Sequence, residues 1–70
     1  MKKVLHVTMF GNSYQVYDVP RLEDPVTAKT EKECADAISD YIRRNPDTTV
    51  EFEKPVSREY RLRISKLAKI

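Results

Sequence analysis

Residues 30–44 constrain the fold more than any other part of the sequence. Thr30 and Glu33 have the spacing of a capping box, in which the threonine oxygen can accept from the Glu33 amide while the Glu33 carboxylate reaches back to the Thr30 amide. Apolar side chains then recur along one helical stripe, which consists of Cys34, Ala35, Ala37, Ile38, Tyr41 and Ile42. Asn45 can close a helix and Pro46 prevents its continuation. The pattern predicts an amphipathic helix over these residues.

The length and the cysteine content limit the kind of protein that this chain can be. Seventy residues are enough for one domain, residues 1–70, and lie near the smallest size that folds without a disulfide or a metal ion. One cysteine cannot form an internal disulfide, and one cysteine with one histidine cannot supply a zinc site. We therefore expect no metal and no cofactor, and we expect Cys34 to be a buried residue of the helix stripe.

The first ten residues resemble a secretory signal peptide only briefly. Two lysines precede an apolar run, but His6 and Thr8 interrupt that run and it ends by Phe10, which is too short for a signal sequence. No other stretch is long and apolar enough to span a membrane, and an unpaired cysteine suits a reducing compartment. We predict a cytoplasmic protein, located in the host cytoplasm if the gene is viral.

Residues 3–19 alternate between apolar and polar side chains on both sides of the only glycine, and this pattern predicts a β-hairpin. The register of the hairpin depends on its loop. A two-residue turn sets Val7 opposite Val16, whereas a three-residue loop sets His6 opposite Asp18. We prefer the three-residue loop, because it keeps the aspartate off the apolar face of the sheet.

The last segment, residues 59–70, is compatible with two structures. As a strand beside residues 48–53, it forms apolar pairs on one face and pairs of opposite charge on the other. The charged pairs are Glu51 with Arg63 and Glu53 with Arg61. As a helix capped by Ser57, it has an apolar stripe of Tyr60, Ile64, Leu67 and Ala68. We favour the strand, because the helix leaves Leu62 off its apolar stripe.

Together these elements predict an α+β fold of two layers, an antiparallel sheet in ββαββ order with one helix packed on one face. The predicted strands cover residues 3–10, 14–19, 48–53 and 59–70. The predicted core consists of Leu5, Val7, Met9, Tyr17, Val19, Ala35, Ile38, Ile42, Val50, Phe52, Leu62 and Ile64. The other face of the sheet is expected to stay in water, so we look for function there and in the connecting loop over residues 20–29.

Catalysis is the function class that the sequence argues against most clearly. The single histidine, His6, has no nucleophile that can be placed beside it, so a cross-strand pair with Asp18 is its simpler role. Ser13 lacks the flanking glycines of a nucleophile elbow, and one glycine cannot build a phosphate-binding loop. We predict no enzyme activity and no catalytic residues, which leaves open only a metal-free ribonuclease that uses arginines and a tyrosine.

The basic C-terminal segment supports nucleic-acid binding as the alternative function. Its five bases have only one acid among them, and they are Arg58, Arg61, Arg63, Lys66 and Lys69. A sheet with exposed rings and arginines can bind single-stranded DNA or RNA by base stacking and phosphate contacts. In the predicted register Glu51 and Glu53 lie beside two of these arginines and lower the local positive charge, so we rank this function second.

Binding to a protein partner is the function that we rank first, by elimination. Phe10, Tyr14 and Val16 are expected on the open face of the hairpin, and tyrosine and phenylalanine anchor many protein interfaces. Exposed aromatic residues of a hairpin also pack on each other without any partner. These three residues are our candidate contact residues.

Residues 26–38 follow a pattern that many small domains share, with an extended segment, a capping threonine and an alanine-striped helix. In size and element order the chain resembles small phage-encoded inhibitors, which block a host or defence enzyme by occupying its surface. The resemblance implies a non-enzymatic inhibitor or anti-defence protein, and it transfers no site residue.

Overall fold

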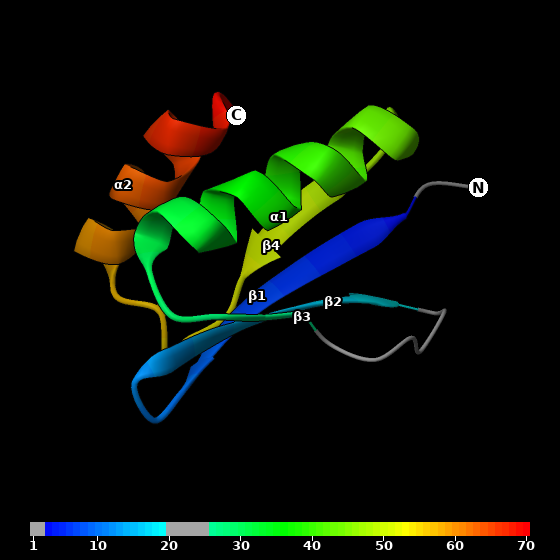
Figure 1. Ribbon diagram of the computed structural model, residues 1–70. Helices are drawn as coiled ribbons and strands as arrows, with labels where there is room; N and C mark the ends of the chain where they lie inside the picture. Colours follow the sequence, from blue (N-terminus) through cyan, green and yellow to red (C-terminus); the bar gives the residue numbers. More distant parts are fainter. Residues whose placement is uncertain (1–2, 20–25) are drawn as a thin grey trace.

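The computed structural model describes residues 3–19 and 26–70 of the chain. The described elements are β1 (Val4–Phe10), β2 (Ser13–Val19), β3 (Val26–Ala28), α1 (Glu31–Arg44), β4 (Thr49–Phe52) and α2 (Arg58–Ala68). The strands lie in the order β3-β2-β1-β4, and β4 runs parallel to β1 while the other pairs are antiparallel. Both helices lie on the same side of the sheet (Figure 1). The predicted α+β class is confirmed, but the purely antiparallel sheet in ββαββ order is wrong.

Helix α1 begins and ends where the sequence predicts. Thr30 Oγ1 accepts a hydrogen bond from the Glu33 amide at 3.1 Å, which is the predicted cap. The Glu33 carboxylate accepts from the amide of Lys29 at 2.9 Å, one residue earlier than the capping box predicts. Asn45 ends the helix with a negative φ of −135°, not in the left-handed conformation, and its side-chain amide donates to the Tyr41 carbonyl at 3.1 Å.

The hairpin has the two-residue turn, so the predicted three-residue loop is wrong. Val7 lies opposite Val16 and Leu5 lies opposite Asp18, which places the aspartate on the face that α1 covers. Gly11 has a φ of +63°, the conformation that a two-residue turn of the II′ type requires at its first position. Asp18 is only 7 % exposed, and the Tyr41 hydroxyl donates a hydrogen bond to its Oδ2 at 2.9 Å. That bond satisfies a carboxylate that the predicted three-residue loop would place on the other face of the sheet.

The C-terminal segment is a helix, so the predicted strand over residues 59–70 is wrong. In the described sheet β4 pairs in parallel with β1, and its other side pairs with no strand. Ile64 and Ala68, four residues apart, are buried against the rest of the core, while Leu62 stays 60 % exposed. The predicted charge pairs with Glu51 and Glu53 are not formed among the described residues. Instead Glu53 Oε1 accepts a hydrogen bond from the Tyr17 hydroxyl at 2.6 Å.

The core lies between the sheet and the helices. Five predicted core residues are buried: Leu5, Val7, Ala35, Ile38 and Ile64. Four others are partly buried against them: Met9, Ile42, Val50 and Phe52. Tyr17 and Leu62 were predicted wrongly, because Tyr17 lies on the opposite sheet face and Leu62 points into solvent. Cys34 is buried, as predicted, and so are five residues absent from the predicted core: Tyr14, Val16, Ala28, Val56 and Ala68.

Two predictions concern residues whose structure is not described. The side chain of Val19, predicted in the core, lies outside the described part of the chain, and so do residues 20–25 of the predicted loop 20–29. The rest of that loop contains β3, which pairs with β2.

Candidate functional site

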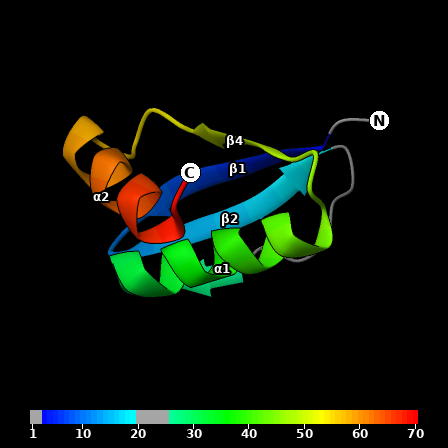
Figure 2. The same ribbon diagram turned by 90° about the horizontal axis from the view of Figure 1, so that it is seen from above.

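Helix α2 is held against α1 through one of its faces. Figures 1 and 2 both show α2 beside the N-terminal half of α1. Ile64 and Ala68 point into the core, and Ser39 of α1 donates a hydrogen bond from Oγ to the Ala68 carbonyl at 3.4 Å. The backbone of α2 ends at Lys69, which adopts the left-handed conformation with a φ of 59°. These contacts orient the helix and decide which of its side chains face solvent.

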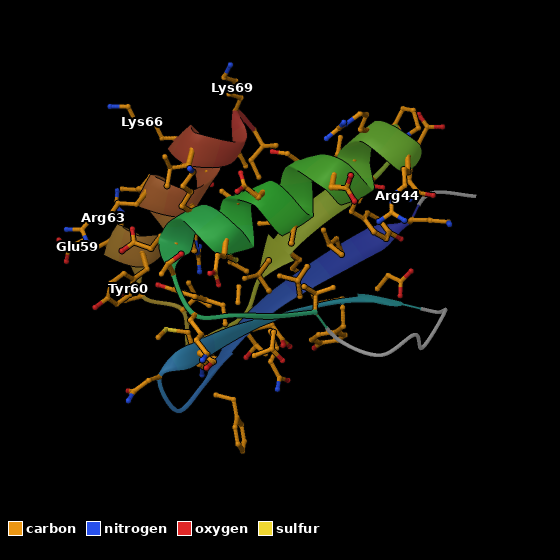
Figure 3. All side chains as sticks on the ribbon, viewed as in Figure 1. Arg44, Glu59, Tyr60, Arg63, Lys66 and Lys69 are labelled. Atoms are coloured by element: carbon orange, nitrogen blue, oxygen red, sulfur yellow. The ribbon has the colours of Figure 1, made fainter. Side chains whose placement is uncertain are left out.

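A second group of contacts ties the first turns of α2 to the beginning of α1. The Arg63 guanidinium pairs with Glu59 at 2.7 Å and with Glu31 of α1 at 3.5 Å. The ring of Tyr60 meets the ring of Tyr14 edge-on, with the centroids 6.4 Å apart. Figure 3 shows Glu59, Tyr60 and Arg63 close together on this side of α2. The side chains of Tyr60 and Arg63 are therefore engaged within the protein.

The third face of α2 faces solvent and combines bases with an apolar residue. We call Arg58, Leu62, Lys66 and Lys69 the outer face of α2. The first three are spaced four residues apart on one helical stripe, Lys69 is the residue that ends the helix, and all four are exposed. Lys66 and Lys69 extend away from the sheet in Figure 3. Leu67 and Ile70 add two more apolar side chains at this end of the molecule, 52 % and 51 % exposed.

The charge of this region is strongly positive. Residues 57–70 carry five bases and one acid, a net charge of +4, whereas the 14 residues of α1 carry three bases and four acids. Within the described part of the chain, no ion pair involves Arg58, Lys66 or Lys69. The guanidinium of Arg61 instead lies 5.8 Å from the centre of the Phe52 ring, a cation–π contact. The predicted cancellation by Glu51 and Glu53 is thus not observed.

The structure separates the three residues predicted to contact a protein partner. Phe10 is 76 % exposed at the end of β1. Tyr14 and Val16 are buried on the opposite sheet face, under α1, because the two-residue turn sets them opposite Met9 and Val7. Phe10, Tyr14 and Val16 therefore form no common surface.

The uncovered face of the sheet carries an aromatic stack. His6 lies opposite Tyr17 and their rings stack with centroids 5.2 Å apart. The predicted pair of His6 with Asp18 is wrong, since Asp18 points to the other face. The Tyr17 hydroxyl donates to Glu53, and this hydrogen bond raises the pKa of Tyr17 above its usual value of 10.0. The Glu53 carboxylate thus lies next to the stack, and its negative charge disfavours the binding of phosphate there.

Few other features suggest chemistry. Cys34 is fully buried, and burial raises the pKa of its thiol to about 11, so the thiolate nucleophile is suppressed near neutral pH. A hollow of about 200 Å³ beside Asp18 and Tyr41 is lined by Arg44 at its rim. No group of three metal-binding side chains occurs in residues 3–19 and 26–70. No described helix is long and apolar enough to cross a membrane.

The outer face of α2 was only half anticipated by the sequence. The sequence predicts its bases as candidate nucleic-acid contacts, but it places them in a strand. It also predicts Leu62 in the core. The signal that could have found it is the pair Ile64 and Ala68, whose helical spacing turns Leu62 outward. In comparisons with known proteins, no family model, curated protein or solved structure matches the chain.

Proposed function

We propose that the chain is a non-enzymatic interaction module that binds a protein and acts, as an inhibitor does, by occupying that partner's surface. The observation that carries the proposal is the number of exposed apolar side chains on α2 and at its C-terminal end. Of the six large apolar residues that are exposed among the described residues, four lie within residues 60–70: Tyr60, Leu62, Leu67 and Ile70. Single exposed leucines are common, so the proposal depends on the four such side chains in this one segment and on the bases beside Leu62.

The positive charge beside these residues gives the proposed interface its specificity. Charged groups at an interface steer encounter and exclude partners of the same charge, while buried apolar anchors supply affinity. The inhibitor role rests on this surface and on the small size of the chain. The comparison with phage-encoded inhibitors also used the ββαββ order, which the structure does not have, so element order no longer supports it.

A photo-crosslinking amino acid at selected positions tests the proposal in cells that express the chain. We compare substitution at Leu62, on the outer face of α2, with substitution at Phe10 and at Gln15 of β2. Leu62 is expected to give a defined adduct that protease removes and nuclease does not. Phe10 is the exposed apolar control, because it is even more exposed than Leu62 but lies at the end of β1 and not on α2.

The crosslinking result separates the candidate surfaces. A protein adduct at Leu62 and not at Phe10 or Gln15 supports the proposal. An adduct at Phe10 alone moves the interface to the end of β1, and an adduct at neither position contradicts a stable protein partner. A nuclease-sensitive adduct at Leu62 favours the alternative function.

Single-stranded nucleic-acid binding remains the second candidate, because the net charge of +4 over residues 57–70 is not cancelled by Glu51 and Glu53. About four phosphate contacts on a single strand give a log–log salt slope of roughly −3. Arg58→Ala would flatten that slope by somewhat less than one unit, with little dependence on base sequence. Binding of short oligonucleotides that is tight and steep in salt would put this function first.

A further inference from the structure

We infer that the partner contributes an acidic amphipathic segment that lies along the outer face of α2; this inference rests on the proposed function and names the chemistry of its partner. The face alternates charge and apolar surface along its stripe. Leu62 lies one turn from both Arg58 and Lys66. The aliphatic stems of these two bases can extend the apolar surface around Leu62 while their charged ends reach outward. A complementary segment needs an apolar side chain at Leu62 and carboxylates on either side of it.

The dimensions of α2 set the length of that segment. Eleven residues form α2, and at about 1.5 Å per residue its axis is roughly 16 Å long. A partner helix that follows the whole outer face therefore needs about three turns. Flanking charges that pair across an apolar contact are the usual arrangement between two packed helices.

The neighbouring helix favours a narrow partner over an extended anionic surface. Helix α1 lies beside α2 and carries one more acid than base, and its Asp36 is exposed without an ion pair among the described residues. An anionic membrane wide enough to cover both helices would also meet the acids of α1. A single segment that follows α2 avoids them.

The side chains of the outer face also favour a protein over a nucleic acid. The face carries no aromatic ring for base stacking, because Tyr60, the aromatic residue of α2, meets Tyr14 at the junction with α1. Leu62 would gain no favourable contact from phosphate oxygens, which would bind only the basic side chains. An acidic segment with apolar residues uses both kinds of side chain.

A randomised peptide library tests this inference without any assumption about the partner. The full chain is immobilised and panned with displayed twelve-residue peptides. The enriched peptides are expected to be acidic and to contain leucine-type residues at helical spacing. They should bind at least about tenfold more weakly to Leu62→Ser and to Lys66→Glu, because each change removes one half of the complementary surface.

Two matched variants control for general effects of charge and hydrophobicity. Lys54→Glu reverses an exposed base outside α2, and Phe10→Ser removes an exposed apolar residue from the end of β1. Both should leave peptide binding unchanged. Circular dichroism melts of all four variants show whether each one is folded, and the sites are exposed, so we expect all of them to fold.

The outcomes are distinct. Enriched peptides that are neutral or basic, or that bind the α2 variants as well as the wild type, overturn the inference, and so does a panning that enriches nothing. Tighter binding of phosphatidylserine vesicles or of a single-stranded oligonucleotide than of the selected peptides also overturns it. If Leu62 still crosslinks to a protein in cells, the proposed function survives that failure. If crosslinking at Leu62 fails as well, both the inference and the proposed function are contradicted.

Discussion

The hydroxyl of Tyr41 on α1 donates a hydrogen bond to Oδ2 of Asp18 on β2, across 2.9 Å and beneath the surface of the protein. This contact joins the helix to the sheet at a position where the strand pattern alone would place an apolar residue. A buried carboxylate is tolerated when it is hydrogen-bonded and is costly when it is not. The contact thus accounts for a register that leaves an aspartate on the covered face.

Tyr41→Phe removes only the hydroxyl and should lower the free energy of unfolding by about 1–3 kcal/mol, because a buried acceptor loses a donor. Urea titration of the purified chain measures the loss. The double variant with Asp18→Asn should lose less than the sum of the two single changes, since both act on one contact. Strict additivity would show that the two side chains do not interact in solution.

Ile38→Ala should unfold most of the population, or come close to doing so. Ile38 is fully buried at the centre of α1, and removing its side chain leaves a cavity that costs about 2–5 kcal/mol. A domain of this size has only about 3–5 kcal/mol in total. The exposed Phe10 is the matched position, where Phe10→Ala should change stability by less than about 0.5 kcal/mol. Thermal melts by circular dichroism would refute the proposed core if both variants shifted equally.

The protein should lose stability in alkaline solution. Burial raises the pKa of the Cys34 thiol from 9.0 to about 11, so the folded state holds this proton more tightly than the unfolded state. That contribution is fully present below pH 9 and is lost as the pH rises from 9 through 11. The raised pKa of Tyr17, chiefly due to its bond to Glu53, acts in the same direction above pH 10.

Chemical denaturation between pH 8 and pH 11 measures this loss, and Cys34→Ala supplies the control. The variant should show a smaller fall in stability over the same range, because it no longer has a thiol to ionise. At pH 8 the native thiol should react far more slowly with a disulfide reagent than the unfolded chain does. Fast reaction in the native state would contradict the buried position of Cys34.

A double-mutant cycle separates the observed helix from the predicted strand at the C-terminus. Glu31→Gln and Arg63→Gln should be non-additive by about 0.2–1 kcal/mol, because these partly exposed side chains form an ion pair at 3.5 Å. Glu51→Gln and Arg63→Gln should be additive, since no ion pair joins them among the described residues. Coupling in the second cycle and not in the first would support the predicted C-terminal hairpin. Both cycles require low salt.

Local signals were sufficient for α1 and insufficient for α2. In α1 the capping threonine, the apolar stripe and the terminal Asn45 and Pro46 all agree on one structure, and the observed bounds match the prediction. In residues 59–70, Leu62 and Ile64 lie two apart as in a strand, while Ile64 and Ala68 lie four apart as in a helix. Short apolar runs do not distinguish these cases. The tertiary contact with α1 determines that residues 58–68 form a helix.

The candidate site, too, can be predicted only in part from the sequence. The sequence supplies the five bases of the C-terminal segment, but their setting depends on whether Glu51 and Glu53 lie beside them, which only the path of the chain determines. The positions of Tyr14 and Val16 depend on the register, and a shift by one residue moves a whole strand's side chains to the other face. A rule that excludes a lone aspartate from the core cannot anticipate a tyrosine that reaches it from another element.

The position of β1 has a consequence for how the chain is made. This strand is central in the sheet, but only one of its neighbours is close in sequence: β2 follows after a two-residue turn, whereas Leu5 pairs with Val50 of β4. During synthesis one edge of β1 has no strand to pair with until residue 52 has been made. Closing that edge spans a long segment of chain, so its entropic cost falls late in folding. A chain in which residues 49–52 have not yet paired with β1 therefore presents an unpaired strand edge to its surroundings, and association with other chains is the hazard of that state.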